Sequence, residues 1–236
     1  SGGDRDRVGL ISDLANQSFR FAEERRFALA HAAISEASSN ALADIDNHVD
    51  DVRLTRYQLV TAVNNSLDSG RYVEIRGDAG VGKSGVLKHF AEQISDEAKP
   101  LVFSPNRIIP RGWTAMRSEI GFDGTAKELL IDCAASGSAI IFIDGMDFFN
   151  EQERTTVIDM VRVAANIPGI NVIATARRDF GTEEPNWIPP ETLSTLGVAP
   201  SVIIDELTDD EIGELSSAAP SLAPLLADTH PARDVA

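Results

Sequence analysis

The most informative segment of this sequence is Gly77-Asp78-Ala79-Gly80-Val81-Gly82-Lys83-Ser84. A β-branched run precedes it at 71–75, and a helical pattern follows it over 83–95. A Gly-rich turn of this spacing that ends in Gly-Lys-Ser, between a strand and a helix, is a P-loop. Its glycines let successive backbone N–H groups turn toward phosphates, and the helix adds its positive N-terminus. The motif therefore predicts a site for a nucleoside triphosphate with Mg²⁺.

The side chains at the end of the motif have separate tasks. Lys83 supplies a mobile positive charge for the β- and γ-phosphates, and the Ser84 hydroxyl is suited to ligate Mg²⁺. Gly85, the next residue along the helix, completes the predicted set of nucleotide-binding residues.

A second sequence element, with acidic side chains, is needed to hold the metal. The apolar run 140–143 ends in Asp144-Gly145-Met146-Asp147. An aspartate at the carboxyl end of a central strand lies beside the P-loop in such sheets, so Asp144 is predicted to orient Mg²⁺. Asp147 is predicted to accept a proton from the attacking water. The alternatives are a simple strand-ending Asp-Gly turn for Asp144 and a surface carboxylate for Asp147.

A third element is Thr175-Ala176-Arg177-Arg178, which directly follows a strand pattern at 169–174. Arg177 is predicted to reach the γ-phosphate and to report its presence. The alternative is a pair of surface arginines on a loop. The Asn-Lys-x-Asp signature that reads guanine does not occur in the sequence, which favours ATP over GTP.

Strand and helix patterns alternate from residue 71 onward, which predicts an α/β fold with a parallel sheet and helices on both faces. Strands are expected at 71–75, 101–103, 139–143, 169–174 and 201–204. Helices are expected at 83–95, 125–135, 151–166 and from 208 onward. The segment 105–124 is expected to be rich in loops, and 178–200 is expected to be irregular with room for one helix.

Before the P-loop, the polar segment 4–45 is predicted to be one long helix or a helix pair with a thin apolar stripe. An acidic connector at 45–52 and a helix at 53–69 follow. We divide the chain into an N-terminal helical segment (1–45), a P-loop NTPase domain (46–207) and the start of a helical lid (208–236).

Composition narrows the possible functions. The 236 residues carry a net charge of -16, which disfavours direct nucleic-acid binding and anionic membranes. The single cysteine, Cys133, and four scattered histidines offer no disulfide and no zinc spacing. No apolar run is long enough for a transmembrane helix, and we expect a cytoplasmic protein.

The combination of GDAGVGKS, IIFIDGMD and VIATARRD resembles the STAND branch of the AAA+-related P-loop ATPases, which includes the NACHT proteins. The likeness is greatest to large bacterial STAND proteins, many of which are implicated in antiphage defence, and it covers about residues 45–215. Upstream, the segment 52–59 resembles the short helical lead-in of such domains, in which an arginine, here Arg56, approaches the nucleotide.

This resemblance implies a five-stranded parallel sheet in the order 2-3-4-1-5 and a switch mechanism. ADP would hold a closed monomer, whereas ATP with Mg²⁺ would favour self-association through the ATPase domain and activate a fused effector. The effector and sensor domains would lie elsewhere in the full-length chain, of which this module would be an excised part.

Two departures from the family pattern predict slow ATP hydrolysis. Phe148 stands where a glutamate is common, and the segment 180–205 contains no lysine or arginine that could serve as an arginine finger. Two alternatives remain beside the switch: an assembly scaffold that binds nucleotide without hydrolysing it, and a P-loop phosphotransferase.

Overall fold

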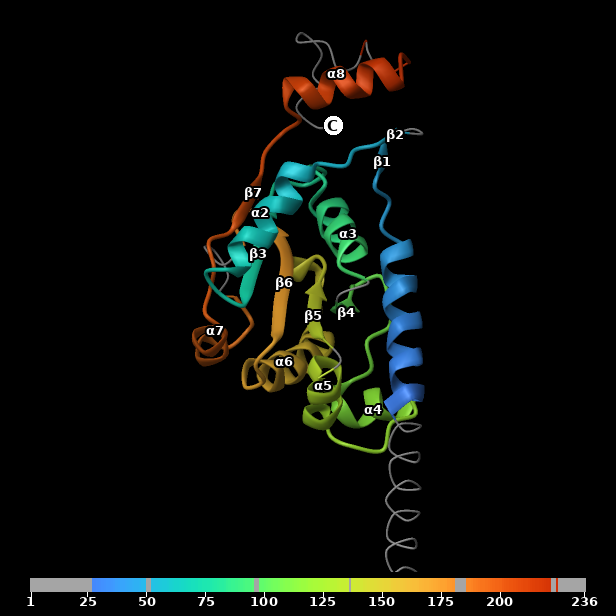
Figure 1. Ribbon diagram of the computed structural model, residues 1–236, viewed down its shortest axis with the longest axis vertical. Helices are drawn as coiled ribbons and strands as arrows, with labels where there is room; N and C mark the ends of the chain where they lie inside the picture. The colour runs from blue at the N-terminus through green and yellow to red at the C-terminus, as the bar shows by residue number, and fades with distance from the viewer. Residues whose placement is uncertain are drawn as a thin grey trace, which may run out of the picture.

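The computed structural model describes residues 27–49, 52–95, 98–135, 137–180, 186–221 and 224. Within them, five parallel strands form one sheet in the order β4-β5-β6-β3-β7 (Figure 1). The strands are β3 (Tyr72–Gly77), β4 (Ala98–Phe103), β5 (Ser138–Ile143), β6 (Ile170–Arg177) and β7 (Val202–Ile204). Numbered by their place in the chain, they run 2-3-4-1-5. The predicted fold class and strand order are confirmed.

Helices cover both faces of this sheet. One hydrophobic core includes residues of α2 and α3, and the other includes residues of α4, α5, α6 and α7. The helices are α2 (Tyr57–Leu67), α3 (Lys83–Gln93), α4 (Gly112–Glu119), α5 (Ala126–Ala135), α6 (Glu151–Ala165), α7 (Pro190–Leu196) and α8 (Asp209–Ala218). Strand β5 lies between these two layers, which explains its continuous apolar run.

Local sequence signals account for where several helices begin. Asn150 and Glu153 form a capping box at the start of α6, and Thr208 and Glu211 form another at the start of α8. Before α5, the Glu128 N–H donates to the Thr125 hydroxyl, and the Thr125 N–H donates to Glu128 Oε2. Each box satisfies backbone donors that the first helical turn leaves without an intrahelical partner.

The structure corrects three local expectations. The segment 105–124 contains helix α4, because tertiary contacts outweigh its prolines and glycines: the Gly112 N–H donates to the Thr156 hydroxyl at 2.6 Å. The connector 45–52 contains the short antiparallel strands β1 (His48–Val49) and β2 (Val52–Arg53). Helix α2 begins at Tyr57 rather than at 53, because Arg56 adopts a left-handed backbone conformation.

A helix over residues 27–43 covers the outer edge of the sheet at β4. The buried hydroxyl of Ser38 donates to the Pro100 carbonyl at 3.0 Å and accepts from the Val102 N–H at 3.2 Å. The helix thus satisfies edge-strand groups that would otherwise invite pairing with another chain. Residues 4–26 of the predicted helix lie outside the described residues, and the three-domain division stays a prediction.

We expect Ser38→Ala to lower the free energy of unfolding by about 2 kcal/mol, because it leaves a buried N–H and a buried carbonyl without their partner. Urea denaturation followed by circular dichroism measures this loss. The matched control is Ser39→Ala, which removes an exposed hydroxyl from the same helix. Equal stability of the two variants would show that Ser38 does not hold the sheet edge.

Candidate nucleotide site

The P-loop lies at the carboxyl edge of the sheet, between β3 and α3. Gly77 ends β3, where a Cβ atom would lie 2.5 Å from the Ile204 carbonyl oxygen on β7 and 2.7 Å from Val81 Cγ2. Gly82 has φ +89°, a conformation that L side chains rarely adopt. Close packing at the first glycine and backbone geometry at the second therefore require the residues that the motif contains.

Lys83 lies across the mouth of the loop. Its Nζ donates to the carbonyl oxygens of Gly77 at 3.0 Å and Asp78 at 2.6 Å. Burial lowers the pKa of Lys83, while the carboxylates of Asp147 and Asp78 oppose that change. The ammonium group thus sits among acceptors that phosphate oxygens could replace.

The structure brings the two predicted metal ligands into contact. The Ser84 hydroxyl donates to Asp144 Oδ1 at 2.7 Å, and the Asp144 side chain is buried. The Thr175 hydroxyl also donates to Asp144 Oδ1 at 2.7 Å and accepts from the Gly145 N–H at 2.7 Å. Thr175 therefore fixes the turn that carries Asp144.

Sequence reasoning did not select Thr175 as a site residue. Its signal is a hydroxyl residue in a strand that is otherwise apolar. The pairing of Ile143 with Ala174 in the β5–β6 register then places the next residues, Asp144 and Thr175, side by side. That signal becomes readable only once β5 and β6 are known to be neighbours.

Asp147 and Arg177 form an ion pair, with 3.2 Å between Asp147 Oδ2 and Arg177 Nε. The contact lacks hydrogen-bond geometry, so Oδ2 is a buried oxygen without a hydrogen-bond partner. The Arg177 guanidinium also lies over the ring of Phe148, 5.6 Å from its centroid, and Phe148 is 65% exposed. Phe148, which stands where a glutamate is common, thus contacts the predicted sensor, Arg177, through a cation–π interaction.

The partners of Arg178 differ from those of Arg177. It pairs with Asp205 at 2.5 Å and lies 3.7 Å from the Asp78 carboxylate of the P-loop. Arg177 therefore contacts the acidic turn after β5, whereas Arg178 contacts the segment after β7. Only Arg177 meets the predicted catalytic aspartate.

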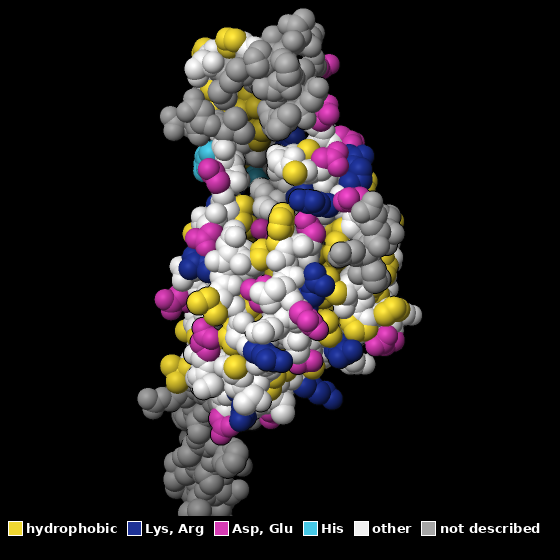
Figure 2. All heavy atoms as spheres, turned by 180° about the vertical axis from the view of Figure 1, so that it is seen from behind, with side chains coloured by type: hydrophobic (Ala, Val, Ile, Leu, Met, Phe, Trp, Pro, Cys, Tyr) yellow, Lys and Arg dark blue, Asp and Glu magenta, His cyan; other side chains and the backbone are white. Residues whose placement is uncertain are grey.

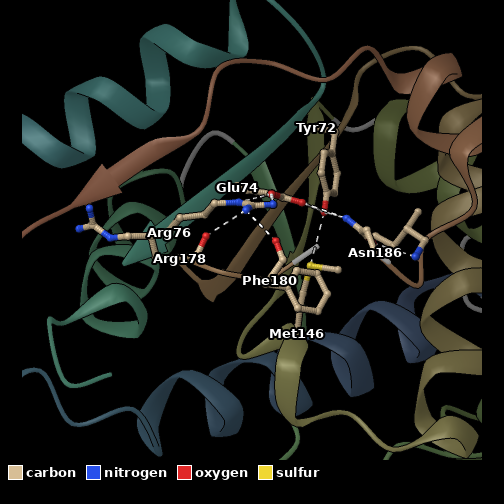
Figure 3. Close-up of polar contacts among 8 residues, drawn as sticks. Tyr72, Glu74, Arg76, Met146, Arg178, Phe180 and Asn186 are labelled. Carbon is tan, nitrogen blue, oxygen red and sulfur yellow. Dashed lines mark hydrogen bonds and ion pairs between the residues drawn. The ribbon is translucent and has the colours of Figure 1, made fainter. Parts of the chain in front are cut away.

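A buried polar network lies behind these turns (Figure 3). Glu74 on β3 accepts hydrogen bonds from the Tyr72 hydroxyl at 2.7 Å, Arg76 Nε at 2.6 Å and Asn186 Nδ2 at 3.0 Å. Arg76 continues to the Phe180 carbonyl at 2.7 Å, and the Tyr72 hydroxyl lies 3.4 Å from Met146 Sδ. The network therefore joins β3 to the turn after Asp144 and to the turn after Arg177.

A cavity of about 160 Å³ lies on the other side of the P-loop. Asn47, Arg56, Gly82, Gly85 and Leu207 are among the residues that line it. The Asn47 Oδ1 atom is buried and has no hydrogen-bond partner. An amide side chain that lines a small cavity beside a phosphate loop is suited to the edge of a nucleotide base.

The described contacts of Arg56, predicted to approach the nucleotide, are with protein groups. Its buried guanidinium donates to the Val81 carbonyl in the P-loop and to Glu211 Oε1 at 2.8 Å. Arg56 therefore supports the loop backbone.

Outside the P-loop region, the described residues show neither a separate metal-binding group nor, on the face shown in Figure 2, a basic surface. No group of three His, Cys, Asp or Glu side chains within the described residues could hold a metal ion alone. On the face shown in Figure 2, Lys and Arg side chains are interspersed with Asp and Glu, and they form no continuous basic stripe. No helix in the described part of the chain is long and apolar enough to cross a membrane.

No protein-family model and no curated protein matches the sequence. Among solved structures, the chain is similar to a Walker-type ATPase of Pyrococcus abyssi, with 13% identity over 80% of this chain and 63% of that one, at a TM-score of 0.46. The Cdc6p protein of Pyrobaculum aerophilum is 18% identical over 68% of this chain and 48% of that one, at 0.46. The ORC1 protein of Aeropyrum pernix, solved in complex with DNA, is 16% identical over 82% and 59%, at 0.48.

In each case the chain spans less than two thirds of the other protein's length. At TM-scores below 0.5, the likeness to these three structures does not indicate the function of this chain. The function of this chain is therefore inferred from its motifs and from the geometry of its own site.

The buried network predicts a pH-dependent stability. Burial and the neighbouring Glu74 carboxylate raise the pKa of Tyr72 well above 10.0. An unfolded chain releases this proton near pH 10 while the folded chain keeps it, so Tyr72's contribution is complete below about pH 10 and is lost as the pH rises further. We expect the free energy of unfolding to fall more steeply above about pH 10 in the parent protein than in Tyr72→Phe.

Urea titrations at several alkaline pH values measure these slopes. The matched control is Tyr57→Phe, since Tyr57 is exposed and is the other of the chain's two tyrosines. The control should keep the parent slope. Identical slopes for Tyr72→Phe and the parent protein would contradict the expectation.

Proposed function

We propose that the chain binds ATP with Mg²⁺ at the P-loop and hydrolyses it slowly. The observation that carries this proposal is the contact between the Ser84 hydroxyl and the buried Asp144 carboxylate, at the end of a loop that also presents Lys83. These oxygens suit Mg²⁺, which prefers hard ligands and usually shares them with nucleotide phosphates. When bound, the ion neutralises charge on the phosphate oxygens.

The residues present fit such an ion. Ser84 would ligate it directly and Asp144 would orient it, while Thr175 holds the Asp144 carboxylate in place. Asp147 Oδ2, which pairs with Arg177 but accepts no hydrogen bond, lies at the same edge of the sheet. This set lacks a third protein ligand of its own among the described residues, which is why the nucleotide is expected to complete it.

The cavity beside the P-loop would take the base. The Asn47 amide can accept from the exocyclic amine of adenine and, through its NH₂ group, donate to a ring nitrogen. An amide can also serve guanine, so adenine is favoured by the sequence, in which the guanine signature is not found. Competition of GTP against bound ATP checks this assignment, because equal affinities would contradict it.

Hydrolysis requires that a water oxygen attack the γ-phosphorus while the bond to the ADP oxygen breaks. Asp147 would position this water and accept its proton. In the structure Arg177 neutralises Asp147 and stacks on Phe148, so Asp147 is not free for this task until Arg177 moves. The γ-phosphate is the natural competing partner for Arg177, which would make the arginine report the presence of ATP and would make turnover slow.

At a finer level, the chain would be the switch module of a STAND-type, AAA+-related protein. ATP would promote self-association through this domain and activate a fused effector in antiviral or antiphage defence. This proposal is supported by the motif resemblance over residues 45–215 and by the ion pair that a γ-phosphate could rearrange.

A second candidate is an assembly scaffold that binds ATP without hydrolysing it. It is favoured by Phe148 in the glutamate position and by the pairing of Asp147 with Arg177. The two candidates share the nucleotide site and differ only in whether bound ATP is converted to ADP.

We expect Lys83→Ala to weaken binding of Mg²⁺-ATP by more than roughly tenfold, because a charge-assisted contact to the phosphates is lost. Isothermal titration calorimetry on the folded variant measures the dissociation constant. Lys127→Ala removes an exposed lysine from α5 and should bind as the parent protein does. Unchanged affinity of Lys83→Ala would refute a nucleotide site at the P-loop.

We expect Asp147→Asn to keep ATP binding but to slow single-turnover hydrolysis by roughly a hundredfold, because the proton acceptor is lost. Rapid-quench measurement of ADP formed from bound ATP gives the rate. Asp123→Asn, which neutralises an exposed acid on another loop, should have no effect. If the parent protein forms no ADP over hours while it binds ATP, the scaffold candidate is favoured instead.

A further inference from the structure

Arg56 has the only positive φ among the described residues that are not glycine, with φ 43° and ψ 43°. A residue with a Cβ atom is disfavoured in this left-handed conformation, and it persists only where surrounding contacts hold it. Here those contacts are made by the side chain. Its side chain is only 7% exposed, although arginine usually lies on the surface.

The guanidinium joins two parts of the chain that are far apart in sequence. Nη1 donates to the Val81 carbonyl in the P-loop, and Nε donates to Glu211 Oε1 at 2.8 Å in the first turn of α8. The other oxygen of Glu211 accepts from the Thr208 N–H at 2.8 Å and so caps α8. An unbroken path of hydrogen bonds thus runs from the phosphate loop to the start of α8.

The contact with Val81 also determines which way a P-loop N–H points. No cis peptide occurs in the described backbone, so the carbonyl of Val81 and the N–H of Gly82 point in opposite directions from one peptide plane. With the carbonyl held by Arg56, the Gly82 N–H faces away from Arg56. A Cβ at Gly82 would lie 3.4 Å from Arg56 Nη1, which shows how closely the guanidinium supports this peptide.

Helix α8 is otherwise set apart from the sheet. Figure 1 shows it beyond the carboxyl ends of the strands, reached by the segment after β7. A cleft of about 420 Å³ lies among α2, β7 and α8, and acidic side chains line it. The cleft contains Arg56 and Glu211, and its remaining acids are Asp205, Glu206, Asp210 and Glu214. The buried ion pair therefore crosses a cleft whose other charged lining residues are acidic, and of these Asp205 is paired with Arg178.

We propose that Arg56 is a positioning residue that orients the Val81–Gly82 peptide toward the phosphates and, through Glu211, links nucleotide binding to the docking of α8. The proposal rests on the nucleotide site proposed above. A docked α8 keeps Arg56 on Val81, which prepares the loop for phosphate. By linkage, bound nucleotide stabilises the docked position of α8 by the same factor.

The test is a double-mutant cycle of Glu211→Gln and Arg56→Gly, with Mg²⁺-ATP affinity measured by calorimetry. Glutamine still serves the capping box, so α8 keeps its cap while the ion pair is lost. Glycine adopts the left-handed backbone of position 56 readily, so only the side chain is removed. We expect Glu211→Gln to weaken ATP binding roughly fivefold to tenfold when Arg56 is present and not at all in Arg56→Gly.

Glu214→Gln is the matched control, because it removes the same charge from an exposed site on the same helix and in the same cleft. It should leave ATP affinity unchanged. Arg56→Lys keeps the charge but not the two-sided donor geometry, and it should bind ATP nearly as weakly as Arg56→Gly. If Arg56→Gly does not fold, Arg56→Lys takes its place in the cycle.

Hydrogen exchange adds a readout that ATP affinity alone does not provide. ATP should slow amide exchange in the first turn of α8 in the parent protein and should leave it unchanged in Arg56→Gly. The inference is overturned if Glu211→Gln weakens ATP binding equally with and without Arg56, or if it leaves ATP binding unchanged or tightens it. It is also overturned if ATP does not change the rate of amide exchange in α8 of the parent protein. If the parent protein does not bind ATP, the proposed function fails first and the inference fails with it.

Discussion

The position of β6 between β3 and β5 is the constraint on which the site depends. β3 carries the P-loop and β5 carries the carboxylate that is predicted to orient the metal, but the two strands are not neighbours in the sheet. The inserted strand supplies Thr175, whose hydroxyl holds Asp144 where the Ser84 hydroxyl can reach it. Because all three strands are parallel, their carboxyl ends meet at one edge, and their last side chains converge there.

Buried polar groups behind the site serve the same geometry. A carboxylate in the interior is costly unless it is paired and fully hydrogen-bonded, and Glu74 meets both conditions. The network it anchors ends on the Phe180 carbonyl and near Met146, in the two turns that present Arg177 and Asp147. Strand β3 thus carries a buried polar side chain that holds the neighbouring loops, at a position where an apolar side chain would only pack.

Two arginines that the sequence analysis selected have different roles in the structure. Arg177 lies in the candidate site, where it contacts Asp147 and the ring of Phe148, so Phe148 is a partner of the predicted sensor. Arg56 lies behind the P-loop and contacts its backbone. Its two partners are 25 and 155 residues away in sequence, and no local pattern indicates either of them.

The sequence was sufficient to predict the P-loop between a strand and a helix, the parallel α/β class and the acidic turn after the apolar run, because spacing and hydrophobic pattern are local properties. It did not indicate helix α4, whose prolines and glycines predict a loop while contacts such as Gly112 with Thr156 make a helix. Thr175, Glu74 and the Arg56–Glu211 pair also emerged only from the tertiary structure. Their chemistry depends on which strands and helices become neighbours, and that is decided by the packing of the whole sheet.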